Sequence, residues 1–265
     1  MTKSNVQPIG MPTQFKFYFI ILSLFSSTWL ISNITAVKLI NVFGITLTGG
    51  FIVFPLTMML GTVIVEVYGY KNSRQAIWAG FILNSLFVFF TNLVGIIPPS
   101  PHWSLQNEYS HILIPDSRII IASLISFMLS DFSNSYLMAK MKIKSKGKSL
   151  LKRILTSYSL SISIDILCFM ILAFAGAIPT FLLIKLISAA FIKKILFQIA
   201  LLPFTCFLID WLKRKEEYEI YDYDTKFNPF SIDNIYQIGA FKNIESTNSN
   251  ATSNGTIIVS FSENK

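Results

Sequence analysis

The sequence predicts an all-α, polytopic membrane protein with six transmembrane helices. Hydrophobic residues make up 52% of the 265 residues and charged residues only 14%, whereas soluble domains usually carry roughly a quarter charged residues. Apolar stretches also recur along the chain, each about as long as the ~20 residues that a helix needs to cross a hydrocarbon core. No isolated soluble domain of useful size remains between them.

The six predicted spans follow one another with short connections. They are Lys16 to Ala36, Ile45 to Val67, Ala76 to Ile97, Ile119 to Ala139, Ile154 to Ala175, and Thr180 to Ile209. We expect the first span to be retained, because it lacks the cleavage site of a signal peptide and five more spans follow it. The predicted domains are an N-terminal segment (1–15), a six-helix transmembrane domain (16–210) and a largely disordered tail (211–265), which has too little apolar content to fold alone.

The connections carry most of the Lys and Arg residues on one side, and that side is expected to be cytoplasmic. With the N-terminus inside, the cytoplasmic side receives Lys3, Lys16, Lys71, Arg74, the run KMKIKSKGKSLLKR (140–153) and KRK (213–215), whereas the outside receives Lys38 and Arg118. Both termini are therefore predicted to be cytoplasmic, in the inner (cytoplasmic) membrane. The net charge of +8 suits anionic lipid. It does not indicate nucleic-acid binding, because the basic run lacks interleaved aromatic residues.

Polar residues inside the spans are the candidates for function, since a charge at the centre of a membrane costs about 2.5 kcal/mol or more. Ser157, Ser161 and Asp165 form one stripe on the fifth span, and Lys194 and Gln198 share a face of the sixth. This pattern predicts a polar cavity between the two helices. The alternative is structural: the serines let helices pack closely, and an ion pair between Lys194 and Asp165 fixes the helix register.

An acidic residue, Glu66, ends the second span, and a helix break is expected directly after it at Gly69. The next span begins beside Lys71 and Arg74. Two interpretations remain open for Glu66. It is either part of a functional site or an interfacial acid that forms a salt bridge with Lys71 or Arg74.

Two stretches resemble the signature of a known family. ISNITAVKLINVFG and FPLTMMLGTVIVEVYGYKNSRQAIWAGF are similar to blocks of the queuosine precursor transporter family, also described as vitamin-uptake-transporter-like. The resemblance covers about Ile31 to Asp222, including an EEYEIYD block near the end. The chain departs from the family pattern where membrane carboxylates are common, at Thr62, Ile162 and Gln198, and it carries Glu219 in place of Asp.

The resemblance implies an importer of 7-deazaguanine bases, such as queuine or its cyano or aminomethyl precursors, salvaged for modification of transfer RNA. It also implies a fold similar to the substrate-binding subunits of energy-coupling-factor vitamin importers. A carboxylate next to an amide or an ammonium would suit the donors and the carbonyl of a guanine-like edge. The expected substrate-binding residues are Asn33, Glu66, Asn92, Arg118, Asp165, Lys194 and Gln198. No cofactor or metal is expected.

Other classes of function remain as alternatives. The chain could be the substrate-binding subunit of a multi-component vitamin importer that requires an energising partner, and a homo-oligomer is also open. A membrane enzyme is disfavoured, because the two histidines, His102 and His111, share one outside loop and no His-Glu-x-x-His motif is present. No catalytic residues are therefore expected.

Overall fold

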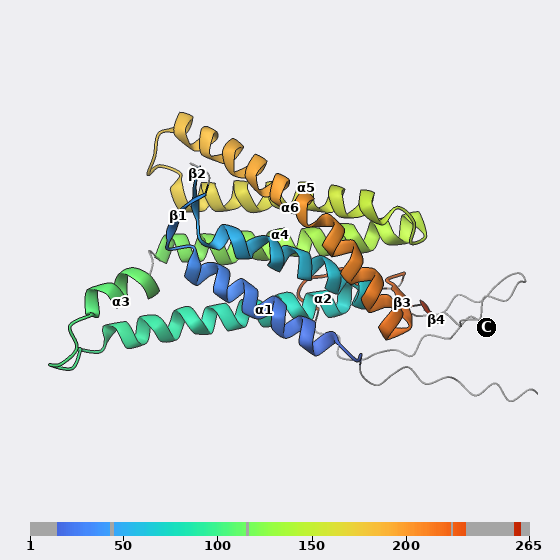
Figure 1. Ribbon diagram of the computed structural model, residues 1–265, viewed down its shortest axis with the longest axis horizontal. Coiled ribbons are helices and arrows are strands. Elements are labelled where there is room, and N and C mark those ends of the chain that lie inside the picture. Colours follow the sequence, from blue (N-terminus) through green and yellow to red (C-terminus); the bar gives the residue numbers. More distant parts are fainter. Residues whose placement is uncertain (1–14, 43–44, 115–116, 224, 232–256, 261–265) are drawn as a thin grey trace, which may run out of the picture.

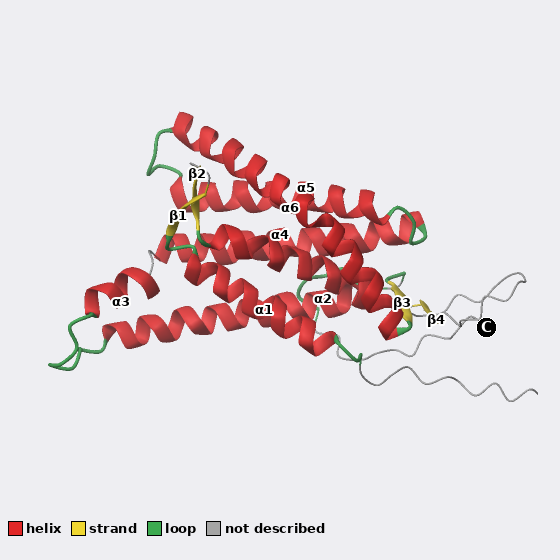
Figure 2. Cartoon of the chain, viewed as in Figure 1, coloured by secondary structure: helices red, strands yellow, loops and turns green. Residues whose placement is uncertain are grey.

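The protein is a bundle of long helices with a small two-stranded sheet at each end (Figure 1). This computed structural model describes residues 15–42, 45–114, 117–223, 225–231 and 257–260. The helices are α1 (Tyr18–Thr35), α2 (Gly50–Ile96), α3 (Gln106–Leu113), α4 (Ser117–Ser145), α5 (Leu150–Phe174) and α6 (Thr180–Glu216). The antiparallel strand pairs are β1 (Leu39–Val42) with β2 (Ile45–Thr48), and β3 (Tyr218–Tyr221) with β4 (Ile257–Ser260). Figure 2 shows that helices dominate between the two sheets.

Within the described residues, 5 helical segments are long and apolar enough to cross a membrane. These are α1, α2, α5, α6 and the Gln106–Ser145 segment that contains α4. Large apolar side chains on the outside of the bundle are exposed, including Phe89, Phe181 and Phe207. An exterior of this kind is typical of helices that face lipid, because nothing in water would stabilise it.

α2 is a helical hairpin and not one straight rod. Gly69 interrupts it with φ 79° and ψ 171°, a conformation that glycine adopts without a steric penalty. α1 contacts both arms of α2, the first arm (residues 50–68) and the second arm (residues 70–96). Ser32 Oγ donates to the Gly50 carbonyl at 3.2 Å, and Asn33 Nδ2 donates to Asn84 Oδ1 at 2.8 Å. A straight helix would separate residues 50 and 84 by about 50 Å. The chain therefore reverses at Gly69, and the predicted break at this glycine is confirmed. Figure 1 shows α2 folded back on itself.

The first arm of α2, residues 50–68, forms the centre of the bundle. Every residue from 57 to 70 is buried, because α1, α4 and α6 all pack against this arm or its bend. Glycines allow the closest approaches. A Cβ at Gly61 would lie 3.3 Å from a ring carbon of Phe25, and a Cβ at Gly80 would lie 2.6 Å from a ring carbon of Trp29. From Thr57 to Tyr68 the first arm is thus shielded from lipid, whereas Ile52 near its start is 53% exposed.

Several predicted span boundaries were wrong. Residues 45–48, placed at the start of the second span, form β2 instead, and the helix begins at Gly50. The short alternation of apolar and Thr residues there pairs with β1, as expected for a strand. α4 continues to Ser145 and α6 to Glu216, so both helices extend beyond their apolar stretches. Lys and Arg are good helix formers and do not end a helix by themselves.

The chain after α6 packs against the bend of α2. We call residues 217–231 the C-terminal segment, of which residue 224 lies outside the described part. Asp222 accepts a hydrogen bond from the Tyr70 N–H at 3.0 Å, which satisfies a donor that the break at Gly69 leaves free. Trp78 Nε1 donates to the Pro229 carbonyl at 2.8 Å. The predicted disordered tail falls largely on residues 232–256 and 261–265, outside the described residues.

Candidate functional site

Five charged side chains meet at the bend of α2, and we call them the charged cluster: Glu66, Lys142, Arg153, Lys213 and Glu219. Glu66 is 1% exposed, and its two carboxylate oxygens accept from Arg153 Nη1 at 2.5 Å and Nη2 at 3.1 Å. Lys213 Nζ lies 2.7 Å from both Glu66 and Glu219. Lys142 Nζ donates to the Glu66 carbonyl at 2.8 Å. The cluster thus joins α2, α4, α5, α6 and the C-terminal segment.

The partners of Glu66 differ from those that the sequence suggested. Its carboxylate pairs with Arg153 and Lys213, while Arg74 donates to the carbonyls of Lys226 and Asn228 in the C-terminal segment. The reason is the hairpin: after the reversal at Gly69, Arg74 faces the C-terminal segment. Lys142 Nζ also lies 3.6 Å from Glu66 Oε1, so three cations surround this carboxylate. The geometry agrees with the salt-bridge interpretation of Glu66, with other partners than the sequence suggested.

The charged cluster also controls the ionisation of the C-terminal segment. Burial alone would raise the pKa of the Glu219 carboxyl, but the neighbouring Lys213 and Lys142 more than offset burial and hold its pKa below the ordinary value. Glu219 therefore stays ionised and bound to Lys213. Burial raises the pKa of Asp222, despite its hydrogen bond from the Tyr70 N–H.

A second polar group lies between the first arm of α2 and helices α4, α5 and α6. We call it the interior polar cluster: Thr62, Asp131, Asn134, Tyr158, Asp165, Lys194 and Gln198. Lys194 Nζ lies 2.5 Å from Asp165 Oδ2, and their side chains are 21% and 6% exposed. The same ammonium lies 3.8 Å from the centre of the Phe54 ring, a cation–π contact. Lys194 and Asp165 therefore form the ion pair of the structural alternative, and their role in binding substrate stays a prediction.

Several atoms of the interior polar cluster have unused hydrogen-bonding capacity. Asn134 Nδ2 donates to Thr62 Oγ1 at 2.9 Å, but Asn134 Oδ1, Gln198 Nε2 and the Tyr158 hydroxyl are buried without a hydrogen-bond partner among the described residues. Thr62, Thr205 and Gln198 are polar side chains beside the Tyr158 hydroxyl, and none of them is its hydrogen-bond partner. Unsatisfied buried groups are costly. The interior polar cluster therefore carries buried donor and acceptor atoms whose hydrogen bonds are unmade among the described residues.

Three other expected substrate-binding residues lie outside both clusters: Asn33, Asn92 and Arg118. Asn33 bridges α1 to Asn84 and also accepts from Ser123 Oγ at 3.2 Å. Asn92 Nδ2 donates to the carbonyl one turn earlier in its own helix at 2.8 Å. The guanidinium of Arg118 donates to the Leu172 and Ala175 carbonyls at the C-terminal end of α5, at 2.8 and 2.6 Å. This contact suits the partial negative charge of that helix end.

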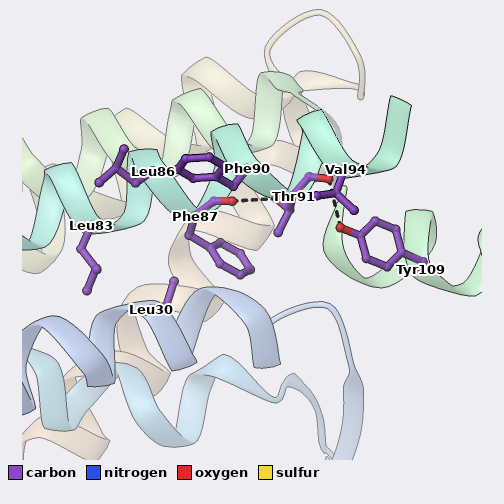
Figure 3. A pocket seen from close by; sticks show the side chains of 8 residues that line it. All are labelled: Leu30, Leu83, Leu86, Phe87, Phe90, Thr91, Val94 and Tyr109. Atoms are coloured by element: carbon purple, nitrogen blue, oxygen red, sulfur yellow. Dashed lines mark hydrogen bonds between the residues drawn. The ribbon is translucent and has the colours of Figure 1, made fainter. Parts of the chain in front are cut away.

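An apolar pocket of about 350 Å³ lies away from both clusters, between α1, the second arm of α2 and α3. Figure 3 shows its lining of Leu, Phe and Val side chains, with Thr91 and Tyr109 at one end. The Thr91 hydroxyl donates to the carbonyl of Phe87 at 2.9 Å, and the Tyr109 hydroxyl donates to the Thr91 carbonyl at 3.1 Å. Both hydroxyl donors are therefore used, so the pocket lacks the free polar groups that would orient a polar ligand.

Sequence reasoning missed several members of the two clusters. Lys142 and Arg153 were assigned to a cytoplasmic loop, yet they are 2% and 1% exposed. Helical spacing was a usable signal for Lys142. It follows Met138, which is buried, by one helical turn and therefore lies on the same face of α4. Asp131 is a recognisable polar candidate in the middle of the fourth span, but it was not among the expected substrate-binding residues. The sequence carries no comparable signal for Tyr158, because its place in the interior polar cluster depends on residues of other helices.

Comparison with known proteins gives this architecture a family. A protein-family model described as "Putative vitamin uptake transporter" matches residues 48–208, which include most of both clusters. A curated protein of Bacillus subtilis (strain 168), described as "Probable queuosine precursor transporter", is 24% identical over 174 residues, 65% of this chain and 76% of that protein. No solved structure matches. By the extent of the family match, the chain belongs to the vitamin uptake transporter family.

Proposed function

We propose that this chain imports queuosine precursors, the 7-deazaguanine bases that include queuine and its cyano and aminomethyl forms, for salvage into transfer RNA modification. The family match supports transport, and the described name of the Bacillus subtilis relative supports this substrate class. The observation that carries the proposal is the interior polar cluster, in which an ion pair and an unsatisfied amide lie together inside the bundle.

The chemistry of the interior polar cluster suits a guanine-like edge. Such an edge presents two N–H donors beside a carbonyl acceptor. The Asp165 carboxylate accepts such donors, and Gln198 Nε2 or Lys194 donates to the carbonyl. Asn33, Asn92 and Arg118 would act at a distance from this site, as supports of helix packing. Glu66 would hold the bend of α2 and not the substrate.

We place the chain in the inner (cytoplasmic) membrane with six spans, counting the two arms of α2 separately. The transport domain comprises residues 16–210, and both termini lie in the cytoplasm. In this orientation the charged cluster and the C-terminal segment form the cytoplasmic end, where Lys and Arg are expected. A reporter inserted near Ser104 should be external, and one fused after Trp211 should be cytoplasmic.

The proposal is tested by uptake in cells that lack their own queuosine precursor transporter. Cells that express this chain should accumulate labelled queuine or one of its precursors and incorporate it into transfer RNA, whereas labelled adenine should not accumulate above background. Accumulation that requires a separate ATPase would favour the substrate-binding subunit of a multi-component importer. Failure to accumulate any precursor, with the protein present in the membrane, would refute the proposed substrate class.

A further inference from the structure

The buried carboxylate of Asp131 has no role in the ion pairs or in the helix contacts described above. It lies on α4, is 0% exposed, and neither of its oxygens has a hydrogen-bond partner among the described residues. The carboxylate packs directly on the first arm of α2, because a Cβ at Gly61 would lie 2.9 Å from Oδ1 and 3.3 Å from Oδ2. A side chain that is fully buried and unpartnered in this way stays ionised only at high cost.

In the part of the chain that the structure describes, no cation forms an ion pair or a hydrogen bond with Asp131. The residue one turn earlier on α4, Phe127, stacks on Trp29 of α1 at 3.9 Å, so this side is apolar. Within the described residues, the charge that acts on Asp131 is that of Asp165 on α5. The nearest cation in the interior polar cluster, Lys194 on α6, is already bound to Asp165.

Among the described residues named here, the other helices around Asp131 add no unpaired positive charge. On α2, Glu66 lies five residues beyond Gly61 and is neutralised by the charged cluster. Tyr158 on α5 is a neutral group in the interior polar cluster. The described part of α1 carries no Lys, Arg, Asp, Glu or His. An ionised Asp131 would therefore add an uncompensated negative charge beside Asp165.

We propose that Asp131 binds the proton that couples substrate import to a proton gradient. The inference rests on the proposed function and adds its energy source. One oxygen of the carboxylate accepts a proton from the outside, the neutral carboxyl accompanies the loaded state, and the same O–H bond breaks when the proton leaves to the cytoplasm. The proton moves with the substrate, and no other bond changes.

Coupling follows from the Asp165–Lys194 pair. A substrate that takes the hydrogen bonds of Lys194 and gives its own N–H donors to Asp165 replaces a full positive charge beside this carboxylate by neutral donors. The compensation of Asp165 becomes weaker, so a negative Asp131 beside it becomes still less favourable. Substrate binding then favours protonation of Asp131, and by linkage protonation favours substrate binding. Proton and substrate therefore load together, as a symporter requires.

The test uses purified full-length protein in liposomes whose membrane potential is clamped at zero. Wild-type protein should accumulate a labelled 7-deazaguanine base when the outside is more acidic, and a gradient of about one pH unit sets a limit of about tenfold accumulation for one proton per substrate. Asp131→Asn mimics the neutral carboxyl. It should lose gradient-driven accumulation but retain exchange of labelled for unlabelled substrate. Asp210→Asn, a matched change at an exposed acid of α6, should keep both activities.

Each other outcome has a definite meaning. Undiminished pH-driven accumulation by Asp131→Asn would overturn the assignment of the proton to this residue. Wild-type accumulation that follows a sodium gradient and ignores the pH gradient would overturn proton coupling. Failure of the wild-type protein to exchange any 7-deazaguanine base would instead refute the proposed function, which separates the two results.

Discussion

Replacing Glu66 with Gln should destabilise the protein without weakening substrate binding. The change keeps the shape of the side chain but removes the negative charge at the centre of the charged cluster. Lys213 keeps Glu219 at 2.7 Å, and Lys142 keeps Glu219 at 3.5 Å. Arg153 loses its carboxylate partner while its side chain remains 2% exposed, and it retains only the carbonyls of the preceding turn.

The expected loss in the free energy of unfolding comes from the Arg153 guanidinium, which stays buried without a carboxylate partner. Removing one partner of a buried ion pair typically costs about 3–5 kcal/mol, and the two lysines still share the Glu219 carboxylate. Removing the guanidinium as well, in Glu66→Gln with Arg153→Met, should restore most of that loss, because no buried charge is then left alone.

Thermal unfolding of detergent-solubilised protein measures the loss, and binding of a labelled 7-deazaguanine base at low temperature measures the site. Asp210→Asn is the matched control, since it removes an exposed acid on α6. We expect Glu66→Gln to lower the melting temperature markedly, with substrate affinity unchanged. An unchanged melting temperature together with lost binding would refute the structural role and return Glu66 to the substrate site.

Three further predictions test the pair, the bend and the C-terminal segment. Asp165→Asn and Lys194→Met should each destabilise the protein by about 3–5 kcal/mol, and the double variant should regain stability but not transport; recovered uptake in the double variant would reduce the pair to a structural contact. Gly69→Ala should cost more stability than Gly176→Ala, because both glycines have positive φ but only the first would press a Cβ onto neighbouring atoms; equal melting temperatures would contradict that packing. Trp78→Phe removes one hydrogen bond to the C-terminal segment and should speed proteolysis of that segment without lowering substrate binding, as limited digestion would show; unchanged digestion would mean that the segment is held by its other contacts.

The sequence predicted the helical architecture because apolar length is a local property. The helix break after Glu66 could also be predicted from the sequence, because Gly69 lies between two apolar stretches and glycine there favours a turn. The β2 strand was missed because four apolar and Thr residues at the edge of a long apolar stretch look the same in a strand or a helix. The predicted C-terminal ends of α4 and α6 were wrong because both helices continue into charged regions.

The interior pair could be predicted from two helices, because Asp165 and Lys194 each lie near the middle of a span, where a charge needs a partner. The charged cluster could not, since it depends on the reversal at Gly69 and on the return of the C-terminal segment. Only that arrangement brings Arg153 and Lys213 to Glu66 from distant parts of the chain. Proximity of this kind is set by tertiary packing and leaves no spacing signal in the sequence.

The most direct test of the central claim is uptake by the purified chain alone, reconstituted in liposomes with a labelled 7-deazaguanine base outside. We predict saturable uptake that unlabelled base competes away, and its loss in the Asp165→Asn, Lys194→Met double variant while that variant remains folded. Absence of uptake by the wild-type chain would contradict a self-sufficient importer. Normal uptake by the folded double variant would contradict a substrate site in the interior polar cluster.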